Sequence, residues 1–171
     1  MQNWQNFYFL CGSSAAGLTG LMFIALTFGA QLVTEKNLDQ VHTFVTTNCI
    51  HFVQVFFLCA VAAIPTVTSG FMALAVVVTG FWRLCRLPKA YMSIRAAQAR
   101  AQDIELSDWF MSLILPGMGY VALLVTGYAF YKDSSSASSL FAGNIIYLLI
   151  IGIKGAWDQL VWTATKVNNN K

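Results

Sequence analysis

Apolar residues occupy five long runs of the chain, and polar or helix-breaking residues separate these runs. The runs cover residues 7–31, 44–64, 67–87, 109–131 and 140–162. Each is close to the ~20 residues that an α-helix needs to cross the hydrocarbon core of a bilayer. Pro65 and Pro88 end the second and third runs, because proline cannot continue a helix. The pattern predicts an all-α integral membrane protein, a bundle of about five transmembrane helices.

The connections between the runs are short, so we expect a single transmembrane domain over residues 1–171. Residues 65–70 carry no charge, and they predict a tight hairpin at one membrane surface. In the longer linker, residues 89–106, apolar side chains such as Ile94, Ala97 and Ile104 recur at helical spacing among polar ones. This linker is predicted to be a short amphipathic helix at the membrane interface.

Composition supports a membrane protein. Hydrophobic residues make up 57% of the chain and charged residues 10%, and the mean hydropathy is +0.63. These values lie well outside the range of soluble proteins. The net charge of +3 comes without a basic patch of interleaved aromatic residues, so no nucleic-acid partner is predicted.

Catalytic and cofactor signatures are missing from the sequence. It contains no HExxH, no GxSxG and no phosphate-binding glycine loop followed by lysine, so we predict no enzymatic activity. The four cysteines have spacings that match neither a zinc site nor a disulfide scaffold. We therefore expect them to be small apolar side chains, and we predict no metal and no cofactor.

The distribution of positive charges predicts the orientation. Half of the ten lysines and arginines fall at the end of the third run or between it and the fourth: Arg83, Arg86, Lys89, Arg95 and Arg100. Short loops rich in Lys and Arg remain in the cytoplasm, so the N-terminus is predicted outside and the C-terminus inside. We expect a multi-pass protein of a bacterial-type plasma or inner membrane. Arg95 and Arg100 of the interfacial helix are candidate contacts for anionic lipid.

Small residues gather on one face of the first run. At ~100° per residue, this face is about 140° wide. Its members are Gly12, Ser13, Ala16, Gly17 and Gly20. In lipid, such a face lets two helix backbones approach closely, which favours helix packing and a homo-oligomer. Alternatively, the face lines a narrow aqueous path in which carbonyl and hydroxyl groups are exposed.

The second run carries a polar stripe. Thr47, Asn48, His51 and Gln54 fall on one helix face, within ~120°. Polar groups are costly in hydrocarbon, so we expect this stripe to face the bundle interior. An imidazole changes its charge in the physiological pH range, which makes His51 the leading candidate for an ion or proton path. Ordinary interhelical hydrogen bonding and ligation of haem are the alternatives for His51.

The fifth run adds Lys154 and Asp158, which share a helix face at i, i+4. The predicted topology brings both to a depth similar to that of His51, in the cytoplasmic half of the membrane. Two alternatives follow. In the first, Lys154 extends to the inner headgroups and has Asp158 as a near-surface partner. In the second, these two residues form a coupled network with His51 and Gln54.

The fourth run contains the sequence LPGMGY at residues 115–120. Pro116 removes a backbone donor, and Gly117 and Gly119 make bending easy, so a kink is predicted there. We interpret it as a simple packing kink; the alternative is a broken helix of the kind that lines binding cavities in transporters.

Three classes of function remain open from the sequence. The first is a small homo-oligomeric channel or transporter for ions or protons, with its polar site in the cytoplasmic half of the membrane. The second is a non-transporting accessory or assembly subunit of a membrane complex. The third is an intramembrane redox protein that holds haem between His51 residues of two copies.

Overall fold

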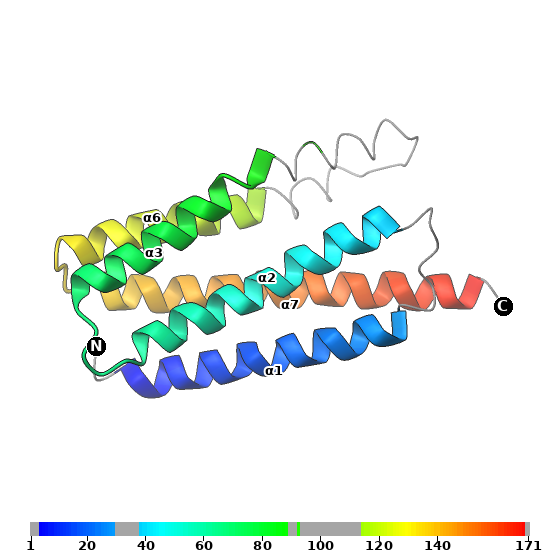
Figure 1. The fold of residues 1–171 in the computed structure, drawn as a ribbon, viewed down its shortest axis with the longest axis horizontal. Coiled ribbons are helices and arrows are strands. Elements are labelled where there is room, and N and C mark those ends of the chain that lie inside the picture. The colour runs from blue at the N-terminus through cyan, green and yellow to red at the C-terminus, as the bar shows by residue number, and fades with distance from the viewer. Residues whose placement is uncertain (1–3, 30–37, 89–91, 93–113, 170–171) are drawn as a thin grey trace. The chain divides into compact units, whose positions relative to one another are not determined.

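The computed structural model describes residues 4–29, 38–88, 92 and 114–169 of the chain (Figure 1). In these residues it contains five long helices and no strand. The helices are α1 (Gln5–Gly29), α2 (Leu38–Ala62), α3 (Ser69–Leu84), α6 (Leu115–Tyr131) and α7 (Ala137–Asn169). The predicted all-α fold is therefore confirmed, and each helix overlaps one of the five apolar runs.

The helix bounds differ from the apolar runs mainly where polar sequence flanks a run. Helix α2 begins at Leu38 rather than at residue 44, and α7 continues to Asn169 rather than ending at residue 162. Backbone hydrogen bonding continues through polar residues, whereas hydropathy marks only the apolar part of a helix. The predicted amphipathic linker, residues 89–106, lies outside the described residues except for Met92.

Two described helical segments are long and apolar enough to cross a membrane, namely Gln5–Ala25 and Ala137–Asp158. Three further apolar segments are shorter within the described residues: Cys49–Ala62, Ser69–Leu84 and Leu115–Tyr131. The core helix of a soluble protein or a signal sequence can have the same length and composition.

The chain divides into two compact units, and α7 begins in one and continues in the other. In residues 64–144, α3 and α6 lie side by side and antiparallel (Figure 1). Gly80 of α3 and Gly127 of α6 permit this close approach. A Cβ at Gly80 would lie 3.2 Å from Cβ of Leu123, and a Cβ at Gly127 would overlap Cγ2 of Val77. Phe130 and Phe141 then stack edge to face, with ring centroids 5.8 Å apart.

The other unit contains α1, α2 and the part of α7 that follows residue 144. Helices α1 and α2 are antiparallel neighbours (Figure 1), and a Cβ at Gly12 would lie 3.1 Å from Cβ of Cys59. Helix α7 approaches α2 at Gly152, where a Cβ would lie 2.7 Å from Cε1 of Phe52. Each of these close contacts requires a glycine on one of the two helices.

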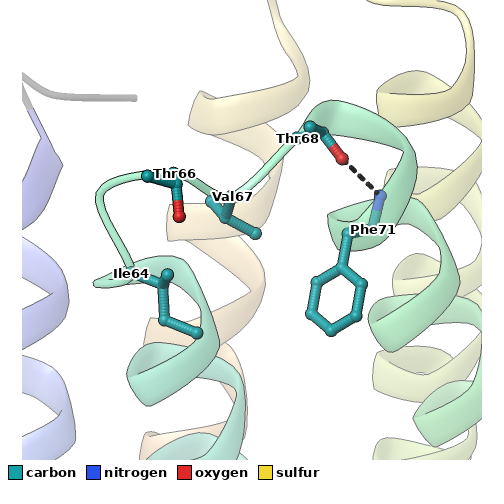
Figure 2. A pocket seen from close by; sticks show the side chains of 5 residues that line it. All are labelled: Ile64, Thr66, Val67, Thr68 and Phe71. Atoms are coloured by element: carbon teal, nitrogen blue, oxygen red, sulfur yellow. Dashed lines mark hydrogen bonds between the residues drawn. The ribbon is translucent and has the colours of Figure 1, made fainter.

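The connection between α2 and α3 is short, as the sequence predicts. Figure 2 shows a surface pocket lined by Phe71 of α3 and four residues of this connection: Ile64, Thr66, Val67 and Thr68. Thr68 caps α3, because its hydroxyl oxygen accepts a 3.3 Å hydrogen bond from the backbone N–H of Phe71. This bond satisfies one of the amide groups that a helix N-terminus leaves without an intrahelical partner.

The outward faces of the helices are apolar. Large hydrophobic side chains are exposed on every one of them, for example Phe9, Phe57, Phe81, Val125 and Ile150. The buried set, in contrast, includes polar and charged side chains: His51, Gln54, Arg83, Thr126 and Asn144. Each of the five described helices therefore has large apolar side chains on its exposed face.

Candidate functional site

Two residues of the predicted polar stripe of α2 are buried in the interior of their unit. His51 is 1% exposed and Gln54 is 6% exposed. They lie one helical turn apart on the face of α2 that also buries Phe52, Val55 and Leu58. The prediction that the stripe faces inward therefore agrees with the burial of these two residues. The side chains of Thr47 and Asn48, which complete the predicted stripe, lie outside the described residues.

The amide group of Gln54 has unusual surroundings. Neither its Oε1 nor its Nε2 forms a hydrogen bond with any part of the chain that the structure describes. A buried amide left in this state costs about 1–3 kcal/mol, so most such groups in native proteins have a partner. The amide can accept through its oxygen and donate through its nitrogen, which suits a water molecule or a small cation.

Lys154 and Asp158 occupy a different environment. Both side chains are exposed on α7, whereas His51 and Gln54 are buried on α2. Their exposure fits the alternative in which Lys154 extends outward and Asp158 is a surface residue. The coupled network of the four residues stays a prediction.

The small residues of α1 divide into two groups. Gly12 is buried against Cys59, but Ser13, Ala16, Gly17 and Gly20 are exposed. A Cβ at Gly17 or Gly20 would have no described neighbour within 4 Å. The stripe that α1 buries in its own unit lies next to this face and consists of Tyr8, Cys11, Gly12, Ala15 and Met22. Most of the predicted packing face is therefore open.

The serine and threonine hydroxyls of α1 bond to their own helix. The Ser13 hydroxyl donates to the carbonyl of Phe9 at 2.8 Å, and the Ser14 hydroxyl donates to that of Leu10 at 2.8 Å. Thr19 donates to the carbonyl of Ala15 in the same way. These bonds engage the hydroxyl protons within α1, whereas the hydroxyl oxygens keep the capacity to accept a hydrogen bond.

A charged site that sequence reasoning missed lies between α3 and α6. Arg83 is 7% exposed, and its Nε and Nη2 donate hydrogen bonds of 3.1 and 2.6 Å to the hydroxyl oxygen of Tyr120. The guanidinium also lies over the Tyr120 ring, 5.0 Å from its centroid. In the sequence, Arg83 contributed only to the predicted orientation. Nothing in the sequence pairs it with a tyrosine 37 positions away.

The predicted kink residues lie in the first turns of α6. Pro116 occupies the start of the helix, where its missing N–H removes no intrahelical bond. Pro116 and Gly119 are buried, and a Cβ at Gly117 would lie 3.6 Å from Cδ1 of Leu87. Because residues 109–113 lie outside the described residues, the kink stays a prediction.

Asn144 of α7 is a second buried amide that the sequence did not single out. Its Oδ1 and Nδ2 form no hydrogen bond within the described part of the chain. A lone asparagine inside the apolar sequence FAGNII was the available signal. Among the described residues, no three His, Cys, Asp or Glu side chains lie close enough together to hold a metal ion.

Comparison with known proteins yields no relative. No protein-family model matches the chain, and neither the curated proteins nor the solved structures contain a match.

Proposed function

We propose that this chain is a multi-pass membrane protein that conducts or transports protons or small ions as a homo-oligomer, with His51 and Gln54 of α2 as its polar site. The observation that carries the proposal is the buried Gln54 amide without a hydrogen-bond partner in the described chain, one turn from buried His51. The proposal has three parts: membrane insertion, a site for a mobile species, and assembly of several copies.

Membrane insertion is supported by the apolar outer faces. Removing a side chain such as Phe9 or Phe81 from water is favourable by about 1.5–3 kcal/mol. If the protein were surrounded by water, these exposed side chains would not gain that free energy. In lipid the same side chains are in a matching solvent, and the buried polar groups remain away from hydrocarbon. The exposed aromatic residues Trp82 and Tyr131 lie near the ends of α3 and α6, as in an interfacial aromatic belt.

A site for a mobile species is supported by the chemistry of the two α2 side chains. Gln54 offers an amide oxygen that can coordinate a cation or accept from water. The imidazole of His51 belongs to the side-chain type that binds and releases protons near neutral pH. An amide kept buried without a fixed partner binds and releases water or an ion at less cost than one that must first break an internal hydrogen bond.

Assembly is supported by the open face of α1. Gly17 and Gly20 have free space above their Cα atoms, and Ser13 and Ala16 extend the same small surface. A helix from a second copy can approach this surface closely. We expect Gly17→Leu or Gly20→Leu to reduce the oligomer fraction measured by light scattering in mild detergent, whereas the half-buried Leu18, changed to alanine, is the matched control. An unchanged oligomer in both glycine variants contradicts assembly through α1.

The transport part is tested with the full-length chain in liposomes. Flux of H⁺, Na⁺, K⁺ and Cl⁻ is measured for the wild type and for Gln54→Leu, which keeps the side-chain volume but removes the amide. The control is Thr79→Val, because the Thr79 hydroxyl bonds only to the carbonyls of Ala75 and Val76 in its own helix. We expect Gln54→Leu to reduce flux at least tenfold and Thr79→Val to retain it.

The accessory-subunit alternative has one observation in its favour: the open α1 face fits a helix of any other membrane protein as well as a second copy. This alternative is supported, and transport is contradicted, if the wild type passes none of the four ions but forms a stoichiometric complex with another membrane protein through the α1 face. The haem alternative is weaker, because haem shared between two copies needs His51 at the outer surface and its side chain is 1% exposed. A visible absorption spectrum of the purified protein tests it.

A further inference from the structure

Arg83 is buried, and no acidic side chain among the described residues pairs with it. Among described residues 64–88 and 114–144, Asp133 is the one acidic side chain, and it follows the opposite end of α6 from Tyr120. At 1.5 Å per residue along α6, the two positions are about 20 Å apart. Burying a guanidinium is costly unless an anion neutralises it, and the phenol of Tyr120 is neutral.

The contacts of Arg83 leave part of the guanidinium available. An arginine side chain has five N–H donors, and Tyr120 accepts hydrogen bonds from Nε and Nη2 only. Within the described residues, Nη1 has no partner. The two bonds to one oxygen, together with the ring contact, hold the guanidinium plane in a fixed orientation. A positioned guanidinium of this kind matches an anion with two oxygens, such as a phosphate or a carboxylate.

The surroundings of Arg83 are positive. Arg86 follows one turn later, and its guanidinium lies 4.4 Å from the ring centroid of Trp82. Leu87 meets Gly117, so the end of α3 lies beside the first turn of α6, where the helix dipole is positive. The exposed Trp82 is typical of the level at which lipid headgroups begin. With the membrane placement proposed above, two cations at this level would face the phosphate layer of a bilayer.

We propose that Arg83 and Arg86 bind the phosphate group of an anionic phospholipid where α3 ends and α6 begins, with Tyr120 positioning the Arg83 guanidinium. This site rests on the membrane placement proposed above but not on ion transport, and it lies on other helices than His51 and Gln54. Inorganic phosphate offers the same chemistry from solution, and a carboxylate of the chain is the competing partner.

The test uses the full-length protein in dodecyl maltoside micelles, which contain no phosphate. Thermal unfolding is followed while phosphatidylglycerol is added, and a galactolipid with the same acyl chains but no phosphate is added in parallel. We expect only phosphatidylglycerol to raise the unfolding temperature of the wild type. Arg83→Gln should weaken this response about tenfold or more in lipid concentration, as expected for loss of a charge-assisted hydrogen bond. The control Lys132→Gln, an exposed cation over Tyr128 at the other end of α6, should retain it.

A second variant keeps the proposal testable where Arg83→Gln does not fold. Tyr120→Phe removes the acceptor of both Arg83 hydrogen bonds, so the guanidinium depends more on the lipid. We expect a lower unfolding temperature without lipid and a larger rise with phosphatidylglycerol than in the wild type. An equal or smaller rise contradicts the site.

The remaining outcomes separate the sources of the anion. In one outcome, millimolar inorganic phosphate stabilises the wild type but not Arg83→Gln, and phosphatidylglycerol stabilises neither. This result overturns the lipid assignment in favour of a soluble anion. Equal responses of the wild type and Arg83→Gln to phosphatidylglycerol overturn the site. A galactolipid response equal to that of phosphatidylglycerol does the same, because it shows that acyl chains alone stabilise the protein.

Discussion

The close contact between α3 and α6 predicts that Gly127→Ala destabilises the protein. The added Cβ would overlap Cγ2 of Val77 and would lie 3.4 Å from the carbonyl oxygen of Ala73. Valine in a helix has one strongly preferred rotamer, so its methyl group cannot turn aside. The helices must therefore separate locally, which also loosens the contact between Gly80 and Leu123.

The size of the effect follows from two opposing contributions. Overpacking a close contact by one methyl group costs about 1–3 kcal/mol. Alanine recovers up to about 1 kcal/mol through its higher helix propensity. The expected net loss is up to about 2 kcal/mol, which in a chain of 171 residues lowers the unfolding temperature by up to roughly 8 °C.

Gly143→Ala is the matched control, because Gly143 is also inside a helix, lies outside the proposed α1 contact, and has no described neighbour within 4 Å of its added Cβ. Its unfolding temperature should remain unchanged or rise. Thermal unfolding of both variants is followed by far-UV circular dichroism in dodecyl maltoside. A Gly127→Ala variant at least as stable as the wild type, or an equal loss in both variants, refutes the reasoning.

Three further predictions concern packing and topology. Gly152→Ala places a Cβ 2.7 Å from the ring of Phe52 and should cost about 1–3 kcal/mol in the same assay; an unchanged unfolding temperature contradicts it. Leu123→Ala empties a fully buried position and should cost about 2–5 kcal/mol, and a loss below 1 kcal/mol would show that the site collapses freely. In a background without native cysteines, a cysteine at Gln98 should react with an impermeant reagent from the cytoplasmic side only and one at Ser136 from outside only; the opposite labelling overturns the orientation.

The helices were predictable from the sequence because hydropathy and proline positions act locally. Pro65 marks the end of α2, and each apolar run became a helix. The face on which a helix packs is harder to predict when lipid surrounds it. Residues on both faces of α1 are apolar or small, so the pattern could not show that Ala15 is buried and Ala16 is exposed.

The contents of the candidate sites were predictable only in part. The polar stripe identified His51 and Gln54, because polar groups in an apolar run must face protein or water. It could not show that the Gln54 amide lacks a hydrogen-bond partner in the described chain, which depends on the surrounding helices. The pairing of Arg83 with Tyr120 arises from the antiparallel packing of two helices, and no local spacing encodes it.

The most direct test of the central claim is the pH dependence of ion flux in liposomes that contain the full-length protein. Flux of the ion that the wild type passes is measured from about pH 5 to pH 8, the range in which histidine ordinarily changes its charge. We expect wild-type flux to vary across this range and His51→Gln, which keeps a polar side chain in the buried site, to show a flat profile. Identical profiles in the two proteins would contradict a role for His51, and a wild type without flux at any pH would contradict transport itself.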